Sequence, residues 1–269
     1  MKIKNILESE GDFFARKYIF EKEGKTVEST YIDKVNKEII CVSNMFGCPV
    51  KCKFCASGSN YFGNLNKDDI SDMIFKIVEG EDISHNRKLL ISFMGSGEPL
   101  LNLGPIKDNI KLMSRIFTNS YFAISMSGVK IDNLNRLNEL DGIDINLKFS
   151  LHSPYDSQRR QIIPRTDSLD KIINVLSDSP FPVELNYCVL DKFNDSDKHA
   201  KDLAVLIKDT NFNLKINKYH QIGNSFIESK NKGKFIAALE KNGVDFEVYT
   251  TDGADINGAC GQLTSQLLI

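Results

Sequence analysis

The chain has 269 residues, 41% of them hydrophobic, which is enough to bury a substantial core in one large domain or two small ones. Lys and Arg together number 34 against 36 Asp and Glu, so the charge balance excludes the global positive field typical of dedicated nucleic-acid-binding proteins. The sequence has neither a run of 18 apolar residues nor a signal-peptide pattern at its start, and we therefore expect a cytoplasmic protein with no membrane partner.

Short β-rich runs alternate with segments of helical period along the chain. Residues 17–32 predict a β-hairpin that turns at 23–25, and residues 37–44 predict the strand after it. We expect Asn66 to cap the next helix, Pro105 to open another, and Asn194 or Asp195 to cap a later one. The remaining expected strands are 89–95, 121–127, 145–152, 183–190, 213–220 and 245–250. The expected helices lie near 67–78, 105–113, 130–140, 168–178, 195–209 and 228–242.

This alternation amounts to about six βα units in succession. Such a series predicts an α/β fold whose parallel strands are joined by right-handed crossovers, either as a full or as a partial barrel. No repeat, low-complexity tract or linker interrupts it, so we expect one domain. In a βα barrel, functional groups gather where the strands end.

Three of the six cysteines form the strongest chemical signal. Cys48, Cys52 and Cys55 have the spacing C-x3-C-x2-C in the loop GCPVKCKFC after a predicted strand. Because cytoplasmic thiols stay reduced, these residues indicate metal ligands more than a disulfide scaffold. Three thiolates can hold a four-iron cluster and leave one iron open, whereas a structural zinc would need a fourth ligand that no nearby His or Cys supplies. A zinc site remains the alternative.

Polar residues follow the next predicted strands. The second barrel strand ends in FMGSGEPLLN, where Gly97 permits close backbone approach and Glu98 can accept a hydrogen bond from an ammonium group. The segments SMSG and SLH supply Ser125, Ser127, Ser150 and His152 at the same rim. An ordinary turn before a helix would explain Glu98 equally well in isolation, and a lone His at a strand end is usually a packing residue.

The cysteine spacing resembles the signature of the radical S-adenosylmethionine (SAM) superfamily. Beyond that, the chain from about residue 27 to its end resembles the RlmN/Cfr-type radical SAM methyltransferases, which methylate an adenine carbon of ribosomal RNA and, in some members, transfer RNA. The segments that carry the resemblance are VESTYI, CVSNMFGCPVKCKFC, GNLNKDDI, FMGSGEPLLNL, ISMSG, FSLHSPYDSQRRQIIP, VLDKFNDS and DINGACGQL.

The resemblance implies a fold and a set of cofactor sites. The fold is a partial (β/α)6-type TIM barrel, the radical SAM core, over residues 37–269, with a short N-terminal β-hairpin extension over 1–36 and a C-terminal active-site loop. Cys48, Cys52 and Cys55 would hold a [4Fe-4S] cluster that binds SAM, and two SAM would be used per turnover. The residues expected to contact SAM are Gly97, Glu98, Ser125, Ser150, Leu151 and His152.

The resemblance also implies a methyl-cysteine relay. One SAM would methylate Cys260, a radical from a second SAM would activate that methyl group, and Cys41 would resolve the adduct, leaving a disulfide with Cys260. For this chemistry the loop that carries Cys260 has to move. Because a thiolate is the nucleophile, we expect a depressed pKa for Cys260 or a base nearby. Glu28 matches a glutamate assigned to proton handling, although it might equally be a solvated strand residue, and Cys188 is expected in the core.

Three functions remain open at this stage. The first is methylation of RNA adenine by a monomer that takes electrons from a donor such as flavodoxin or ferredoxin. The second is the same chemistry on a small molecule, free nucleoside or peptide, suggested by an N-terminal part shorter than the family's accessory domain and by missing arginines near the C-terminus. The third is a non-methylating cluster protein. A local patch for RNA would consist of Lys51, Lys53, Arg159, Arg160 and Arg165, which are otherwise a solvated surface.

Overall fold

The computed structural model describes residues 1–11, 14–83, 87–223, 226–250 and 252–267. Its strands are β1 (Lys2–Glu8), β2 (Ala15–Lys22), β3 (Lys25–Lys34), β4 (Lys37–Cys41), β5 (Met45–Gly47), β6 (Tyr61–Asn64), β7 (Lys88–Phe93), β8 (Ser120–Met126), β9 (Ile145–Ser150), β10 (Val183–Cys188), β11 (Asn213–Asn217), β12 (Phe246–Tyr249) and β13 (Ser265–Leu267). Its helices are α1 (Lys67–Gly80), α2 (Leu103–Ile116), α3 (Asp156–Ile162), α4 (Leu169–Ser177), α5 (Asp197–Ile207) and α6 (Lys232–Lys241), with 3-10 helices η1 (Ala56–Ser59), η2 (Pro99–Leu101) and η3 (Ile131–Leu140).

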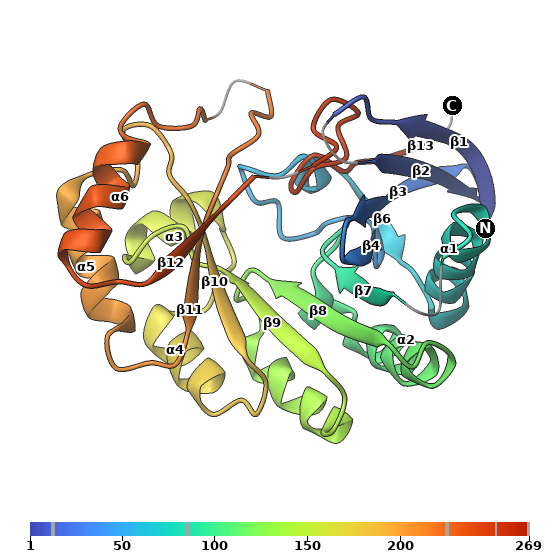
Figure 1. The fold of residues 1–269 in the computed structure, drawn as a ribbon, viewed down its shortest axis with the longest axis horizontal. Helices are drawn as coiled ribbons and strands as arrows, with labels where there is room; N and C mark the ends of the chain where they lie inside the picture. Colours follow the sequence, from blue (N-terminus) through green and yellow to red (C-terminus); the bar gives the residue numbers. More distant parts are fainter. Residues whose placement is uncertain (12–13, 84–86, 224–225, 251, 268–269) are drawn as a thin grey trace.

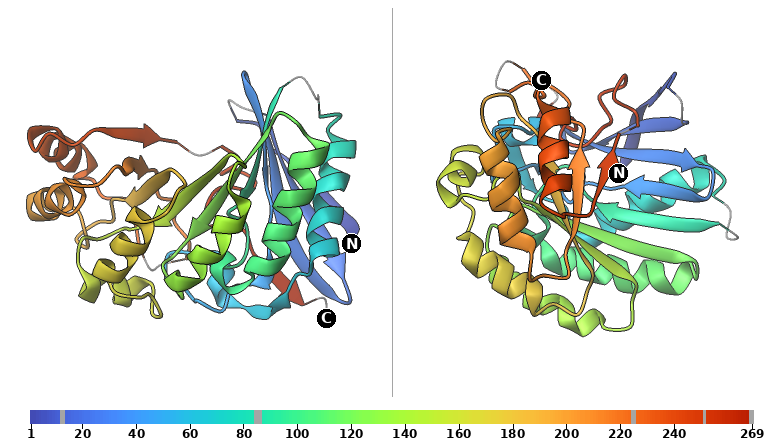
Figure 2. Two further views of the ribbon diagram at one scale, coloured as in Figure 1. Left: turned by 90° about the horizontal axis from the view of Figure 1, so that it is seen from below. Right: turned by 60° about the vertical axis from the view of Figure 1, so that its left-hand side comes forward.

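One large curved sheet organises the molecule. Its strand order is β1-β2-β3-β4-β7-β8-β9-β10-β11-β12, and β13 pairs with β3. The strands from β4 to β12 are parallel, whereas β1, β2, β3 and β13 are antiparallel to their neighbours. The helices line the outer side of the curve (Figure 1; Figure 2). Since the described strands leave β1 and β12 as the two ends of the path, the barrel is partial, as the sequence predicts.

The sequence-based expectations hold for most of the parallel series. Six crossovers join the seven parallel strands, and Asn66 caps α1 by accepting from the Asp69 amide. The hairpin of β2 and β3 turns at Glu23 and Gly24, both of which have positive φ. The division of the chain at residue 36 stays a prediction, because β3 and β4 pair across that point within one sheet.

Several elements differ from the expectations. β1, the β5–β6 pair, α3 and β13 were not predicted; they are short or lie at a sheet edge, where hydrophobic period is weak. The segment 131–140 is a 3-10 helix, and α2 begins at Leu103, before Pro105. Ser196 caps α5, whereas Asn194 is buried and closes the preceding turn by accepting from the Leu190 amide and donating to the His152 carbonyl.

Alternation along the strands separates an apolar outer layer from a polar lumen. In β9 and β10 every second side chain is buried against the helices, and the residues between them are half-exposed and face inward. Burying each large apolar side chain stabilises the fold by roughly 1.5–3 kcal/mol. The rim where these strands end is therefore fixed by the helical layer behind them. Among the described residues, no helix has the length and apolarity needed to cross a membrane.

Candidate active site

The loop between β5 and η1 carries the three cysteines of the C-x3-C-x2-C motif. Cys48 is buried, and its amide donates to the Ser57 and Asn60 carbonyls at 2.9 and 3.0 Å. Burial raises the pKa of Cys48 to about 12 and that of Cys52 well above its usual value, and the neighbouring thiols Cys48 and Cys55 raise the pKa of Cys52 further. The electrostatic coupling indicates that the three sulfurs face a common region.

A close approach between Gly97 and Asn44 lies near this loop, after the end of β7. Gly97 has a φ of +121°, and a Cβ on it would lie 2.6 Å from the side-chain oxygen of Asn44. Asn44 is fully buried, and both polar atoms of its side chain lack a hydrogen-bond partner in the described part of the chain. Since buried polar groups are nearly always hydrogen-bonded, the amide is available to a ligand that the protein alone does not provide.

Glu98 is a buried carboxylate next to Gly97. Its Oε2 accepts from the Ser127 amide at 3.0 Å and the Ser127 hydroxyl at 2.6 Å. Burial raises the pKa of Glu98 to about 7, although these hydrogen bonds favour the charged form. A bound ammonium group would compensate the buried charge.

The ends of β8 and β9 complete the rim. Ser125 and Ser150 are half-buried, on the lumen side of their strands. Leu151 packs into the core instead, and only its backbone borders the rim. His152 is buried with φ +53°, and burial and the nearby Arg159 guanidinium lower its pKa to about 3. Its neutral ring accepts from the Cys188 amide at 3.1 Å and lies edge-on to Phe54, with ring centroids 4.6 Å apart.

Arg159 is buried behind the rim, which corrects its expected place in a surface patch. Its guanidinium donates to the Leu151 and Ser127 carbonyls at 3.0 and 2.9 Å and to the Thr166 hydroxyl at 2.8 Å. Burial lowers its pKa to about 10, and Cys52 lies near enough to oppose that shift. The sequence RR at 159–160 does not distinguish the buried arginine from its exposed neighbour.

Cys41 and the Cys260 segment lie near each other and near the loop that carries Cys48, Cys52 and Cys55. Cys41 is the last residue of β4. Burial is the main cause that raises the pKa of Cys41 to about 12, and the charge of Cys260 is the second. The segment around Cys260 is tied to the cysteine loop because the Ala56 amide donates to the Gly261 carbonyl at 2.7 Å. Figure 1 shows this C-terminal segment close to the loop that follows β5. All six cysteines are free thiols in the structure.

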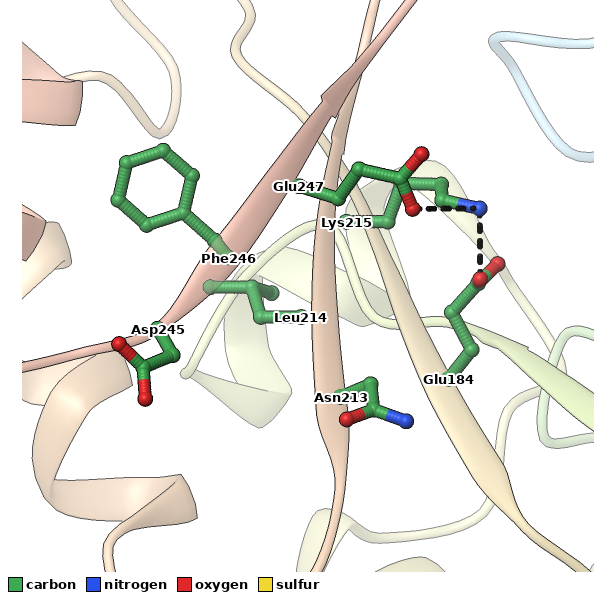
Figure 3. A pocket seen from close by; sticks show the side chains of 7 residues that line it. All are labelled: Glu184, Asn213, Leu214, Lys215, Asp245, Phe246 and Glu247. Atoms are coloured by element: carbon green, nitrogen blue, oxygen red, sulfur yellow. Dashed lines mark ion pairs between the residues drawn. The ribbon is translucent and has the colours of Figure 1, made fainter.

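A ladder of charges fills the lumen below Cys260. Glu184 on β10 pairs with Lys148 at 3.3 Å and with Lys215 at 2.6 Å, and Lys215 also lies 3.4 Å from Glu247. Figure 3 shows Lys215 between the two carboxylates at the edge of a pocket. Sequence analysis missed this ladder, although charged residues alternating with apolar ones in β9 and β10 were a visible signal.

Comparison with known proteins decides the family. Residues 42–204 match the model of the Radical SAM superfamily. A "Probable dual-specificity RNA methyltransferase RlmN" of Clostridioides difficile (strain 630) is 34% identical over 265 residues, which cover 92% of this chain and 75% of that protein. The chain belongs to the RlmN family of radical SAM methyltransferases.

Further relatives agree with this assignment. The "Dual-specificity RNA methyltransferase RlmN" of Buchnera aphidicola subsp. Schizaphis graminum is 31% identical over 94% of this chain and 74% of its own length. The crystal structure of a radical SAM methyltransferase from Sphaerobacter thermophilus superposes with a TM-score of 0.88, over 97% of this chain and 80% of that one, at 23% identity. The fold is therefore that of a radical SAM methyltransferase.

Membership of the RlmN family implies a four-iron cluster and SAM, and the residues of this chain fit both. Cys48 and Cys52 lie near enough to Glu98 for its charge to raise their pKa values, and beside Glu98 the buried Asn44 amide has no partner among the described residues. No group of three or more His, Cys, Asp or Glu within the described ranges is arranged to hold a single metal ion. A four-iron cube is larger than one ion, so its ligands stand farther apart.

The structure corrects two expectations about cysteines in this RlmN-family chain. Cys260 is exposed, yet the protein around it desolvates the thiol and raises its pKa, although Lys148 and Lys215 oppose the shift. The expected depression is wrong because desolvation outweighs two lysines already paired with carboxylates. Cys188 is not a core residue, because it is half-buried at the end of β10. Desolvation, and to a smaller extent the charge of Cys260, raises the pKa of Cys188 to about 12.

Substituting Gly97 with alanine is expected to lower the free energy of unfolding by about 1–3 kcal/mol, because a Cβ would clash with Asn44 in a backbone region that favours glycine. Denaturant unfolding measures the change. Gly104→Ala is the matched control: a Cβ there meets nothing within 4 Å inside α2, so its stability should be unchanged or slightly higher. Equal stability of the two variants would contradict the assigned strain.

Proposed function

We propose that this enzyme methylates a ring carbon of adenine in RNA through a methyl-cysteine relay between Cys260 and Cys41. The observation that carries the proposal is that the residues next to Cys55 and Cys260 are hydrogen-bonded, Ala56 amide to Gly261 carbonyl at 2.7 Å, and that Cys41 lies near enough for the charge of Cys260 to raise its pKa. The RNA substrate is inferred from the relatives, which are named RNA methyltransferases.

The relay answers a chemical problem. The adenine carbon is electrophilic, so it does not attack the methyl group of SAM directly. The Cys260 thiolate is a nucleophile and attacks that methyl group, forming a carbon–sulfur bond as S-adenosylhomocysteine leaves. Lys148 and Lys215 stabilise the thiolate in part, because each opposes the rise in the pKa of Cys260 that burial causes. The first SAM therefore stores a methyl group on the protein.

Radical chemistry then activates the stored methyl group. Cys48, Cys52 and Cys55 would hold a four-iron cluster, which when bound would supply the single electron needed to generate a radical from a second SAM and would take back the electron released later. Cys260 presents its S-methyl group, which loses a hydrogen atom and adds to the ring. The radical adduct then returns one electron, and the Cys41 thiolate accepts the ring proton.

Release of the product uses the same two cysteines. The Cys41 sulfur gives up the proton it accepted and attacks the Cys260 sulfur, the S–S bond forms, and the carbon–sulfur bond breaks with its electron pair on carbon. That carbon takes a proton and becomes the new methyl group. The disulfide must then be reduced before the next cycle. A flavodoxin or ferredoxin as electron donor and a monomeric state stay predictions.

The third alternative, a non-methylating cluster protein, is disfavoured by the family assignment. The second alternative, methylation of a small molecule, free nucleoside or peptide, can be distinguished from methylation of RNA by experiment. Cluster-loaded enzyme, reductant and SAM with a deuterated methyl group are offered RNA, mononucleotides and adenosine, and the digested products are analysed by mass spectrometry. We expect labelled methyladenosine from RNA. Label found only in free nucleoside would overturn the RNA proposal.

A basic surface beside the cysteine loop supports an RNA partner. Val50 and Cys48 pack against Ile162 and Ile163, and the Lys53 amide donates to the Ile162 carbonyl at 2.9 Å. This packing brings the cysteine loop next to the end of α3. The exposed basic residues of the two segments are Lys51, Lys53, Arg160 and Arg165, without the buried Arg159.

Neutralising this surface is expected to weaken RNA binding. Lys51→Gln and Arg165→Gln should each lower affinity and reduce the slope of log affinity against log salt by about 1. Fluorescence anisotropy over a salt series measures both quantities. Lys241→Gln, an exposed lysine at the end of α6, is the control and should bind as the parent does. If all three variants show the same slope, this surface does not contact RNA.

A further inference from the structure

We propose that Lys17 and Glu28 form a clasp that holds both ends of the Cys260 loop, residues 257–264, and thereby sets how readily Cys260 moves. The inference rests on the proposed function for its role in the relay. Its structural content stands on contacts between β2, β3 and the loop. Lys17 is a residue to which sequence analysis gave no role, and Glu28 takes a different role from proton handling.

The clasp contacts the loop on either side of Cys260. The Thr264 amide donates to Glu28 Oε2 at 2.9 Å, after the cysteine. The Lys17 ammonium donates to the Asn257 carbonyl at 3.5 Å, before it. The two side chains join through an ion pair of 3.4 Å between Lys17 Nζ and Glu28 Oε1. One pair of residues thus bridges the two stems.

Because the Lys17–Glu28 ion pair is buried, losing one partner strongly affects the stem of the Cys260 loop. The side chains of Lys17 and Glu28 are only 7% and 11% exposed, so the pair is shielded from water and salt. Removing one partner leaves the other as an uncompensated buried charge, which is costly. The carboxylate would then turn toward solvent and release Thr264. Loss of either residue therefore loosens the same stem.

Between its stems the loop is packed and hydrogen-bonded, and glycines lie on both sides of Cys260. Gly258 packs closely, since a Cβ there would lie 3.1 Å from Thr30, and Gly261 has a φ of +82°. The loop is also attached to the cysteine loop, because the Ser57 hydroxyl donates to the Leu263 carbonyl at 2.7 Å. Cys260 lies between the two glycines, so its thiol can change direction while the clasped ends stay in place.

The contacts of Glu28 favour positioning over proton transfer. One carboxylate oxygen is engaged by the Thr264 amide and the other by Lys17. A general base needs an oxygen directed at the proton it removes. The register of the hairpin places Lys17 opposite Thr30 and Glu28 opposite Ile19, so the pair spans neighbouring strands diagonally. The hairpin thereby serves as the fixed platform for the loop.

Hydrogen exchange and alkylation test the clasp without RNA or turnover. In full-length, cluster-loaded protein, Lys17→Met is expected to raise amide exchange in peptides over 257–264 by at least tenfold and to speed alkylation of Cys260 by a small iodoacetamide. Glu28→Gln keeps an acceptor for Thr264 but loses the ion pair, and should give a smaller increase. Exchange in α4 reports whether each variant stays folded.

The control lies on the same strand. Arg16→Gln removes a pair with Glu8 and Glu81, away from the loop, and should leave both readouts at the parental level. Loop exchange in Lys17→Met equal to that of the parent would overturn the clasp. If the variants loosen the loop as expected but the parent protein does not methylate RNA, only the proposed function is overturned. Failure of the clasp and failure of the proposed function are therefore distinguishable.

Discussion

Replacing Cys260 with alanine is expected to abolish methylation of RNA, leaving only the rate seen without enzyme. The relay stores the methyl group on this sulfur, and the two thiols whose pKa values the charge of Cys260 raises are Cys41 and Cys188. Cluster content should be unchanged, because Cys260 is outside the C-x3-C-x2-C motif. Mass spectrometry of digested RNA and iron analysis of the protein measure the two quantities.

Two further cysteine variants make this result specific. Cys41→Ala should still acquire an S-methyl group on Cys260 but should accumulate RNA covalently joined to the protein, since the resolving thiol is missing. Cys188→Ala keeps the relay pair and should release methylated RNA. If Cys260→Ala methylates RNA at the parental rate, the relay is refuted. If Cys188→Ala no longer methylates RNA, Cys260 is the wrong thiol for the stored methyl group.

Features set by local pattern could be predicted from the sequence. The apolar period in 67–78 and the Asn66 cap produce α1, and the alternation in β9 and β10 produces strands with one buried face. The spacing of Cys48, Cys52 and Cys55 brings the three thiols into one loop. In each case neighbouring residues supply the interaction, so no knowledge of the distant chain is needed.

Features that depend on how the sheet closes could not be predicted. β13 is three residues long and forms only because β3 offers an edge to it. The clasp joins Lys17 to residues more than 200 positions away, which no local period reveals. The prediction of a depressed pKa for Cys260 was wrong for a related reason. The expected reactivity of the thiol suggested a low pKa, whereas the surrounding rim, assembled from several strands, raises the pKa by desolvation.

Arg159 illustrates how burial decides between identical neighbours. α3 has seven residues and follows a proline, so its phase could not be read from periodicity, and the two arginines were both placed on the surface. In the structure the helix points Arg159 at the ends of β8 and β9 and stacks its guanidinium 4.7 Å from the ring centroid of Phe149. Arg160 instead stays exposed, with a distant ion pair to Asp156 at 3.8 Å.

Arg159→Ala is accordingly expected to lower the free energy of unfolding by about 3 kcal/mol or more, because it leaves the Ser127 and Leu151 carbonyls without their charged donor inside the rim. Arg160→Ala, one residue along the same helix, should change it by less than about 0.5 kcal/mol. Denaturant unfolding of the two proteins, purified and loaded in parallel, measures the difference. Arg159→Lys should recover only part of the loss, since an ammonium cannot reach the spread of acceptors that the planar guanidinium does. If both alanine variants are equally stable, the rim does not depend on this buried cation, and the positions of Ser150 and His152 must be held by the strands alone.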